Sequence, residues 1–329
     1  VFDTQLFYGA LAGVVASLGD PYSVFLDPET TQKFTAELSG VFEGIGAEIG
    51  MRKEQLVIIA PLPGTPAEQA LVKAGDRILA IDNKDTRGMP LDIAVSNIRG
   101  PKGSAVELTI LREGWDEPKK FSIVRDTINI ESVRLENLEN NIAHLKIVYF
   151  NESTPVLFEQ AVQKIIGQNS KGVILDLRNN PGGFLEVAVS VASAWVPPEE
   201  VIVWQEFQGG RKEAFRAQGL SRLGDIPTVV LVNNGSASAS EIVAGALSDH
   251  GKAKLVGEKT FGKGSVQSFE QLRGGSSLKL TIAHWLTPKG RKIDKQGIEP
   301  DVEVELTKDN FDNGQDPQLN KALELFNTP

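Results

Sequence analysis

A serine-rich segment of the sequence could supply a nucleophile. Ser238 stands between an apolar run at 228–232 and a helix-forming stretch at 240–247. A side chain at such a strand-to-helix turn projects outward, and the N–H of Ala239 at the helix start could hold an oxyanion beside it. Ser238 and Glu241 also fit a capping box, in which the serine only closes the helix start. Ser238 can act as a nucleophile, rather than only as a helix cap, if a general base lies beside it.

A lysine in a small, apolar setting is the candidate base. Lys263 lies between two glycines, with Phe261 and Val266 close by and no acidic residue within four positions. Burial lowers the pKa of a lysine from about 10.4, so this setting could supply a neutral amine near neutral pH. Gln267 returns to the same face four residues later and could orient the amine. The alternative is a glycine-rich turn with a surface lysine.

Asp249 and His250 offer a competing base for Ser238. Adjacent residues of one element project in different directions, whereas the aspartate of a triad must point at the far nitrogen of its histidine. His250 followed by Gly251 is also typical of a helix end. We therefore favour Lys263 over His250.

A glycine pair could complete the site. Gly182 and Gly183 follow an apolar strand at 173–177 and a turn. Without a Cβ, their backbone can come close to a ligand, and one of their N–H groups could be a second oxyanion donor. We expect Asp176 and Arg178 to hold this loop by hydrogen bonds rather than to do chemistry. A simple turn is the alternative.

The elements around these segments fall into three stretches. Residues 1–39 predict two helices, which cannot bury themselves alone and should pack on the rest of the chain or on a second copy. Residues 40–127 predict short strands with an amphipathic helix at 91–98. Residues 128–329 alternate strands with helices and end in a helix at 316–326, which is typical of an α/β domain. We expect a multi-domain α/β protein.

Composition excludes several other classes of protein. The 329 residues carry a net charge of −9, which argues against nucleic acid as a partner, and no cysteine is present to form a disulfide or a thiolate site. The three histidines lie far apart, so no metal site is expected. No apolar stretch reaches the roughly 20 residues of a membrane span. Because the chain begins with Val1, a natural signal or membrane anchor could precede it.

Taken together, the three segments resemble the C-terminal processing (tail-specific) serine protease family. The resemblance covers nearly the whole chain, and its most specific motifs are GSASASEIVAGAL at 235–247, TFGKGSVQ at 260–267 and DLRNNPGG at 176–183. It implies a crotonase-like α/β peptidase core at 128–329, after an N-terminal helical segment at 1–39.

The resemblance also implies a role for each site residue. Ser238 is the second serine of the Ser-Ala-Ser-Ala-Ser run and would be the nucleophile, with Lys263 as general base and Gln267 as its support. The oxyanion hole would consist of the Ala239 N–H and one N–H from the pair Gly182 and Gly183, and neither metal nor cofactor is implied.

Residues 40–127 resemble the PDZ domain of this family. Gly44, Ile45, Gly46 and Ala47 resemble the PDZ loop whose backbone N–H groups bind a peptide's terminal carboxylate, after which the peptide adds as an extra strand. One departure is Leu71, which stands where bacterial PDZ domains commonly have glycine.

The resemblance implies an endopeptidase that cuts proteins near a free, apolar C-terminus captured by the PDZ domain. Arg99 is a candidate for coupling PDZ occupancy to the active site. Similar proteins work outside the cytoplasm, in the bacterial periplasm, at the cell envelope or in the thylakoid lumen, and many are homodimers. The competing interpretations are an inert binding protein that uses only its PDZ domain, and a hydrolase that uses His250.

Overall fold

The computed structural model describes residues 4–20, 22–38, 41–52, 55–62, 64–73, 75–89, 91–129, 131–307, 309–310 and 313–326. The chain divides into two compact units. The first unit comprises Val1–Gly40, Glu131–Leu306 and Asp316–Pro329; the second comprises Val41–Ile130 and Thr307–Gln315. The predicted boundary between residues 39 and 40 lies outside the described residues.

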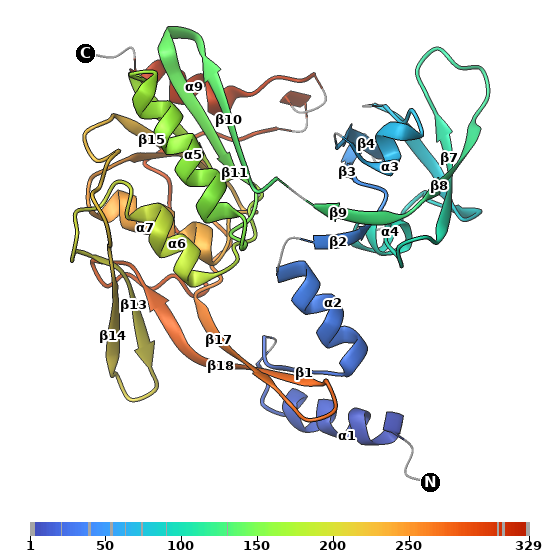
Figure 1. Cartoon of the computed structure of the whole chain (residues 1–329), viewed down its shortest axis with the longest axis horizontal. Coiled ribbons are helices and arrows are strands. Elements are labelled where there is room, and N and C mark those ends of the chain that lie inside the picture. Colours follow the sequence, from blue (N-terminus) through green and yellow to red (C-terminus); the bar gives the residue numbers. More distant parts are fainter. Residues whose placement is uncertain are drawn as a thin grey trace. The chain divides into compact units, whose positions relative to one another are not determined.

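A six-stranded sheet forms the centre of the first unit (Figure 1). The edge pair β10–β11 is antiparallel and the other four pairs are parallel. In sheet order the strands are β10 (Val133–Leu138), β11 (Ile142–Ile147), β12 (Gly172–Asp176), β15 (Thr228–Val232), β16 (Lys254–Gly257) and β19 (Val302–Glu303). The short 3-10 turn η1 (Glu139–Asn141) joins β10 to β11.

Helices cover both faces of this sheet, and for this reason its central strands β12 and β15 are buried at every position and mostly apolar. In β15, Val230 and Val232 belong to a core that includes residues of α5 (Thr154–Gly167), α6 (Leu185–Ala192) and α7 (Ala239–Asp249). On the other face, Val229 and Leu231 belong to a smaller core that includes α9 (Pro317–Phe326). Successive residues of a strand point to opposite faces, so each face of β15 fills a separate core.

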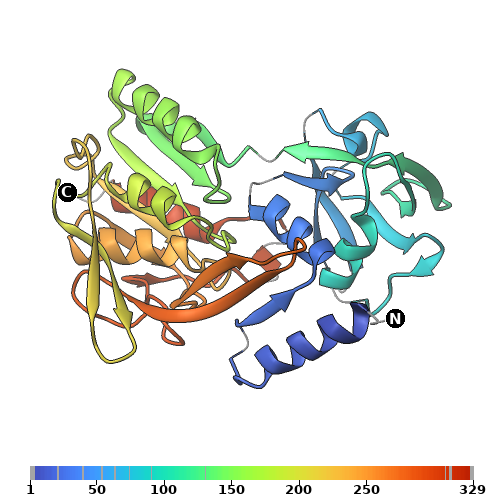
Figure 2. The ribbon, with the colours of Figure 1, turned by 60° about the horizontal axis from the view of Figure 1, so that its bottom comes forward.

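A second sheet of the first unit centres on the long strand β18 (Ser277–Leu286). Its other strands are β1 (Val24–Leu26), β13 (Val201–Phe207), β14 (Lys212–Arg216) and β17 (Ser265–Gln271). Figure 2 shows the β17–β18 ribbon running beside β1 and the N-terminal helices. Thr281 fixes this contact, since its hydroxyl donates to Asp20 Oδ2 at 2.6 Å and its N–H donates to Ser23 Oγ at 3.0 Å.

Two helices flank β1 in the sequence, α1 (Thr4–Ala16) and α2 (Pro28–Leu38). At the start of α2, Asp27 Oδ1 accepts a hydrogen bond of 2.7 Å from the N–H of Thr30, as an N-cap residue does. Of the residues of α1, all of which are described, none is buried. Its apolar side chains therefore contribute nothing to the core of the unit. Among the described residues, no helix has both the length and the apolar composition needed to cross a membrane.

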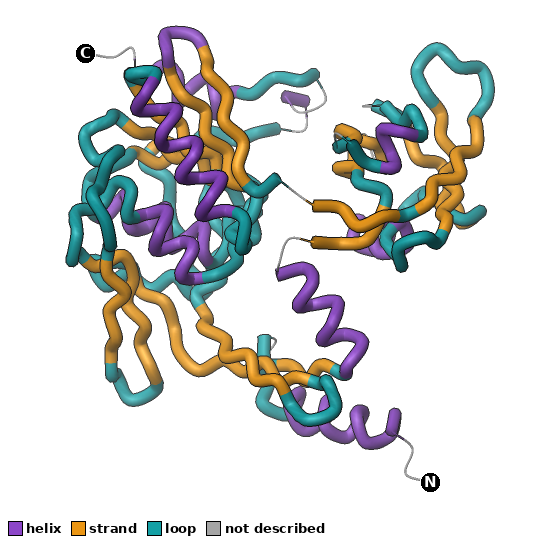
Figure 3. The backbone as a smooth tube through the Cα atoms, viewed as in Figure 1, coloured by secondary structure: helices purple, strands orange, loops and turns teal. Residues whose placement is uncertain are grey.

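The second unit is built on an antiparallel sheet on which the short helices α3 (Pro66–Gln69) and α4 (Leu91–Ile98) pack (Figure 3). In sheet order its strands are β3 (Ala47–Arg52), β4 (Gln55–Pro61), β5 (Arg77–Ile81), β7 (Ala105–Leu111) and β8 (Lys119–Val124). The strand β6 (Lys84–Asp85) pairs with β5, and β2 (Val41–Gly44) pairs with β9 (Asp126–Asn129). Alternate residues of β7 fill the core between these helices and the sheet.

Leu71 ends the α3 segment in the conformation that glycine favours. Its φ is +60°, and its N–H donates to Glu68 O while the N–H of Val72 donates to Ala67 O. This bonding pattern closes a helix C-terminus through a left-handed residue. The leucine thus keeps the helix end that the common glycine would give, with a steric cost at its Cβ.

Candidate active site

Three neighbouring parallel strands bring the predicted site segments together. The glycine-pair loop follows β12, the serine loop follows β15 and the lysine loop follows β16. Because these strands are parallel and adjacent, their carboxyl ends lie at one edge of the sheet. Hydrogen bonds join the loops directly: the N–H of Ala237 donates to Asn180 O, and the N–H of Phe261 donates to Ser236 O, each at 3.0 Å.

Ser238 has a backbone conformation that a simple helix cap does not need. Its φ is 54° and its ψ is −112°, whereas an N-cap residue is ordinarily extended. A non-glycine residue in such a region costs on the order of 1–3 kcal/mol, and such strain concentrates at functional sites. A strained serine at a strand-to-helix turn is the arrangement that exposes a nucleophile. The backbone therefore favours the nucleophile interpretation over the cap.

The buried carboxylate of Glu241 joins the serine loop to the lysine loop. Its Oε2 accepts hydrogen bonds from the N–H of Ser238 at 2.8 Å and of Lys263 at 2.9 Å. Its Oε1 accepts from the N–H of Gly262 at 2.7 Å and from the Thr260 hydroxyl at 2.6 Å. The sequence suggested only half of this role, the contact with Ser238 across one helical turn.

Burial and hydrogen bonds act on Glu241 in opposite directions. The side chain is fully buried, and the loss of solvent raises the pKa of its carboxyl group, although the four hydrogen bonds oppose the shift. A carboxylate buried without a paired charge is costly. The position of this carboxylate between the two loops is consistent with a role in holding their geometry.

Lys263 is half-buried, and this burial lowers the pKa of its amine. The charge of Glu241 opposes the shift, so the lysine does have an acidic neighbour in space although it has none close in sequence. The ammonium group also lies 5.8 Å from the centre of the Tyr22 ring. A lysine with a lowered pKa has the property that a general base requires near neutral pH.

Gln267 lies near Lys263 but has a different hydrogen-bond partner. Its Nε2 donates to Ser265 Oγ at 2.6 Å and to Ser265 O at 3.2 Å. Within the described part of the chain, no hydrogen bond joins Gln267 to Lys263. The prediction assumed that residues four apart in a strand point to the same face. A register shift between Val266 and Gln267 in β17 interrupts this alternation. The orienting role of Gln267 stays a prediction.

The two members of the glycine pair differ, and Gly182 lies against Ser238. A Cβ on Gly182 would lie 2.9 Å from Ser238 Cβ and 2.8 Å from Ala237 O, so only glycine fits there. The N–H of Gly182 already donates to Asn180 Oδ1 at 2.9 Å. Gly183 forms a bridge with Phe150 in which the hydrogen bonds involve Gly182 O and the N–H of Phe184. The N–H of Gly183 itself therefore points away from Phe150.

Two backbone donors are therefore open at this site. Within the described residues, the N–H groups of Gly183 and Ala239 have no acceptor. Both residues line the same cavity as Ser238. Of the glycine pair, Gly183 is thus the better candidate for the second oxyanion donor.

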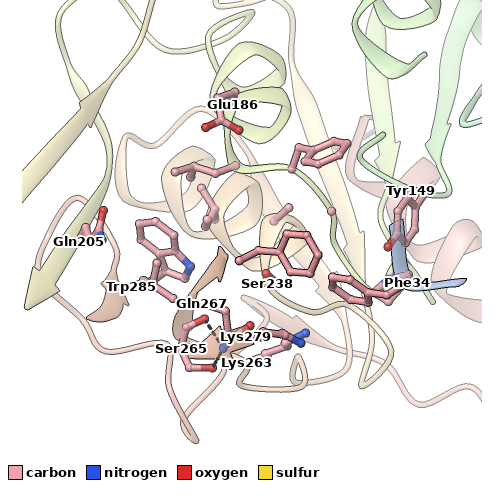
Figure 4. A pocket seen from close by; sticks show the side chains of 18 residues that line it. Phe34, Tyr149, Glu186, Gln205, Ser238, Lys263, Ser265, Gln267, Lys279 and Trp285 are labelled. Carbon is pink, nitrogen blue, oxygen red and sulfur yellow. Dashed lines mark hydrogen bonds between the residues drawn. The ribbon is translucent and has the colours of Figure 1, made fainter. Parts of the chain in front are cut away.

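A cavity of about 390 Å³ surrounds these groups (Figure 4). Five predicted site residues line it: Gly183, Ser238, Ala239, Lys263 and Gln267. A second lysine, Lys279 of β18, lines the cavity too and was not predicted. Burial lowers the pKa of Lys279, and the positive charge of Lys263 lowers it further. Lys279 could have been found only from the pairing of β17 with β18.

Asp176 and Arg178 hold the loop by hydrogen bonds, as predicted. The guanidinium Nε and Nη2 of Arg178 donate to the two carboxylate oxygens of Asp176 at 3.0 and 2.8 Å. Nη1 donates to Asp316 at 2.9 Å and to Gln318 at 3.1 Å, which ties the loop to the start of α9. The pKa of Asp176 is well below its usual range, because hydrogen bonds from His144 and Arg178 outweigh the effect of burial.

The alternative that uses His250 as the base is wrong. His250 caps the far end of α7 from Ser238, and an 11-residue helix is about 16 Å long. Its Nε2 lies 2.8 Å from Val201 O. Asp249 accepts from the N–H of Lys289 and pairs with Arg291, so it does not orient the histidine toward the serine. Among the described residues, no group of three possible metal ligands is gathered either.

The predicted carboxylate loop of the second unit leads into an open sheet edge. Gly46 has a φ of +72°, and a Cβ there would lie 2.4 Å from Thr65, so glycine is required. Among the described residues, the N–H groups of Ile45 and Gly46 have no acceptor. β3 begins at Ala47 and is an edge strand, with α4 beside it. A peptide could add to such an edge as a further strand. Arg99 directly follows α4.

Two family models match the chain. Residues 141–304 match peptidase family S41, and residues 35–111 match the PDZ domain. A carboxyl-terminal-processing protease from Synechocystis sp. is 39% identical over 328 residues, which cover 97% of this chain and 76% of the relative. The chain belongs to the carboxy-terminal processing protease family. The resemblance predicted from the three motifs is thereby confirmed.

Other members of the carboxy-terminal processing protease family are similar over most of the chain. The protease CtpA of Bacillus subtilis is 41% identical over 304 residues, which cover 92% of this chain and 65% of the relative. The solved structure of a photosystem II D1 C-terminal processing protease is 31% identical, with a TM-score of 0.64, and the match covers 92% of this chain and 83% of the other. The chain thus combines a PDZ domain with an S41 peptidase domain.

Proposed function

We propose that this protein is a serine endopeptidase that cleaves other proteins near their C-termini with Ser238 as nucleophile and Lys263 as general base. The observation that carries the proposal is the strained Ser238 in one cavity with a lysine whose pKa is lowered by burial. Family membership supports the reaction class.

In the proposed mechanism, neutral Lys263 takes the hydroxyl proton as Ser238 Oγ attacks the substrate carbonyl carbon. The negative charge on the carbonyl oxygen is held by the N–H groups of Ala239 and Gly183. The lysine then passes its proton to the departing amine, and an acyl-enzyme remains. Water repeats the steps on the ester and restores Ser238. Gln267 would orient the lysine amine.

The second unit would capture the substrate through its carboxyl terminus. We propose that the backbone at Gly44, Ile45, Gly46 and Ala47 binds the terminal carboxylate, while the tail extends along the edge of β3. Support comes from the unpaired N–H groups of Ile45 and Gly46 and from the open edge. The coupling role of Arg99 stays a prediction.

Several broader expectations are kept as proposals. They are the domain limits 1–39, 40–127 and 128–329, the crotonase-like form of the core, an extracytoplasmic location, a membrane anchor and a homodimer. The parallel strands with crossing helices in the first unit agree with such a core.

Cleavage of an unstructured protein with an apolar C-terminal tail tests the proposal. Wild type should cut near the tail, as read by mass spectrometry, and Ser238→Ala and Lys263→Ala should not. A substrate with an amidated C-terminus serves as the control for tail capture and should be cut more slowly. Capture of the tail by wild type without cleavage would overturn the peptidase and support a binding protein. Activity in Lys263→Ala would overturn the assignment of the base.

A further inference from the structure

A second lysine, Lys279, lies in the candidate active site but has no part in the mechanism proposed above. It lines the same cavity as Ser238 and Lys263, and Figure 4 shows the two lysines together with Gln267. Both lysines are half-buried. In the described part of the chain, neither amine forms an ion pair or a hydrogen bond. Two cationic side chains thus share one partly closed site.

Like charges in such a site repel each other more strongly than they do in water. The effective dielectric constant near a partly buried pair is about 20, compared with about 80 in bulk water. The repulsion acts on both groups and disfavours the state in which both are protonated. Burial lowers the pKa of Lys279, and the charge of Lys263 lowers it further. The two lysines therefore titrate as a coupled pair, and one of them loses its proton first.

The carboxylate of Asp20 favours the proton on Lys279. Although burial opposes the shift, hydrogen bonds from Ser23 and Thr281 lower the pKa of Asp20, so it stays an anion. Thr281 stands two residues after Lys279 in β18, so the two side chains lie on the same face of the strand. The charge of Asp20 accordingly raises the pKa of Lys279. The amine also lies 5.2 Å from the centre of the Phe34 ring, which favours a cation.

The surroundings of Lys263 hold a proton less firmly. Its carboxylate neighbour is Glu241, whose own pKa is raised by burial and whose charge is divided among four hydrogen-bond donors. The other ionisable groups that line the cavity or pack against the lysine loop and β18 are Asp20, Tyr22, Tyr149, Glu186 and Asp294. Of all these carboxylates, Glu241 acts on Lys263 and Asp20 acts on Lys279.

We propose that Lys279 is a positioning residue for the general base: it keeps its proton beside Asp20, and its positive charge holds Lys263 in the neutral form. This inference rests on the proposed peptidase function. Lys279 takes no proton from Ser238. When Lys263 accepts the serine proton, two like charges lie close together until Lys263 passes that proton to the departing amine. The repulsion therefore favours the second proton transfer as well.

The pH profile of kcat/KM tests this role with two matched variants. Lys279→Met removes the charge, so the midpoint should rise by about one pH unit and the rate below the midpoint should fall about tenfold. At high pH, where Lys263 is neutral in both proteins, the difference should disappear. Lys279→Arg keeps the charge at every pH and should keep the wild-type midpoint. Lys254→Met, at an exposed lysine of the same unit, is the control for the loss of one charge.

Two kinetic results would overturn the inference. An equal loss of rate at every pH in Lys279→Met, with an unchanged midpoint, would mean that Lys279 only supports the structure. A midpoint in Lys279→Arg that rises as in Lys279→Met would mean that the charge of Lys279 is not what acts on Lys263.

A titration without turnover separates this inference from the proposed reaction. In Ser238→Ala labelled with ¹³C-lysine, the ¹³Cε shift of each lysine reports its protonation, and the signals of Lys263 and Lys279 are assigned by their loss in Lys263→Met and Lys279→Met. Lys263 should lose its proton at lower pH than Lys279, and it should do so at higher pH once Lys279 is replaced by methionine. This result without cleavage by wild type would refute the peptidase and keep the coupling. Cleavage by wild type, with Lys279 the first to lose its proton, would refute the inference and keep the peptidase.

Discussion

The pKa of the Lys263 amine depends on a balance between its burial and one nearby carboxylate. Burial lowers the pKa of its amine and the charge of Glu241 raises it, with burial the larger effect. The sequence showed the first influence through the small and apolar neighbours of the lysine. The second comes from a residue 22 positions earlier in the chain.

The pH dependence of cleavage should follow the lysine. In the proposed mechanism the neutral amine is the active form, so kcat/KM should rise with pH and level off, with a midpoint below the ordinary lysine value of about 10.4. A pH series with a neutral peptide substrate measures this midpoint, and Ser238→Ala gives the background. Lys263→Arg should be inactive at every pH, since a guanidinium does not deprotonate. A rate that falls as pH rises would contradict the assignment.

Glu241 should act on the reaction through position rather than by contact with substrate. In Glu241→Gln, an NH₂ group would face some of the four donors that now bind the carboxylate. We expect kcat to fall about 10–100-fold with little change in KM, because a displacement of about 1 Å of catalytic groups costs that much. Steady-state kinetics measure the split, and Glu270→Gln, at an exposed glutamate, is the control. A change confined to KM would argue against a positioning role.

At the scale of the elements, parallel strands assemble the site. Three adjacent strands each deliver one loop to the same edge, and backbone hydrogen bonds between loops fix their spacing. The second sheet adds to the cavity from a different direction, since β17 and β18 contribute Gln267, Lys279 and Trp285. Hydrogen-bonded pairing to a central strand holds each of these side chains at a set register.

The C-terminal end of α3 offers a position at which a substitution should stabilise the protein. Leu71→Gly should stabilise the second unit by about 0.5–1 kcal/mol, because the residue at φ +60° would lose its Cβ clash, less the extra entropy of an unfolded glycine. Calorimetry of the full chain would show the unfolding transition of this unit at a higher temperature. Leu71→Ala keeps the Cβ and should give no gain. Destabilisation by the glycine would mean that the exposed leucine side chain makes a compensating contact.

At the scale of the whole molecule, the N-terminal helix α1 has no buried residue. The described residues of α1 are all at least partly exposed, and Leu6 and Val14 are 74% and 68% exposed. The sequence predicted that this segment would pack on the rest of the chain or on a second copy. Within its own unit α1 packs on β1, where the ring centres of Tyr8 and Phe25 lie 5.7 Å apart. Packing of its exposed apolar side chains on a second copy stays a prediction.

This expectation can be tested by sedimentation. Wild type should sediment as a dimer, and Leu6→Ser with Val14→Ser should shift it toward the monomer, because buried apolar area stabilises association. Val156→Ser, at an apolar residue of α5 that is 62% exposed, should leave the dimer intact. A wild-type monomer at high concentration would refute the predicted homodimer.

The sequence by itself determined the elements and the chemistry of the motifs. The strand at 228–232 was predicted with its observed bounds, and the helix predicted at 240–247 is extended by one residue at its start and two at its end. Apolar runs and glycine stops are local signals, so they can be read from one segment. For the same reason Ser238, Lys263 and the glycine pair could be singled out.

Only the tertiary structure decided which of these groups meet and what else meets them. The strands β13, β14 and β17 have mixed, half-buried patterns and were not predicted, and through β13 and β18 the chain brings Gln205 and Trp285 into the cavity. Glu241 binds a loop about 20 residues further along, and His250 is ruled out by the length of α7. Register and long-range hydrogen bonds depend on pairs of segments, and no single segment carries that information.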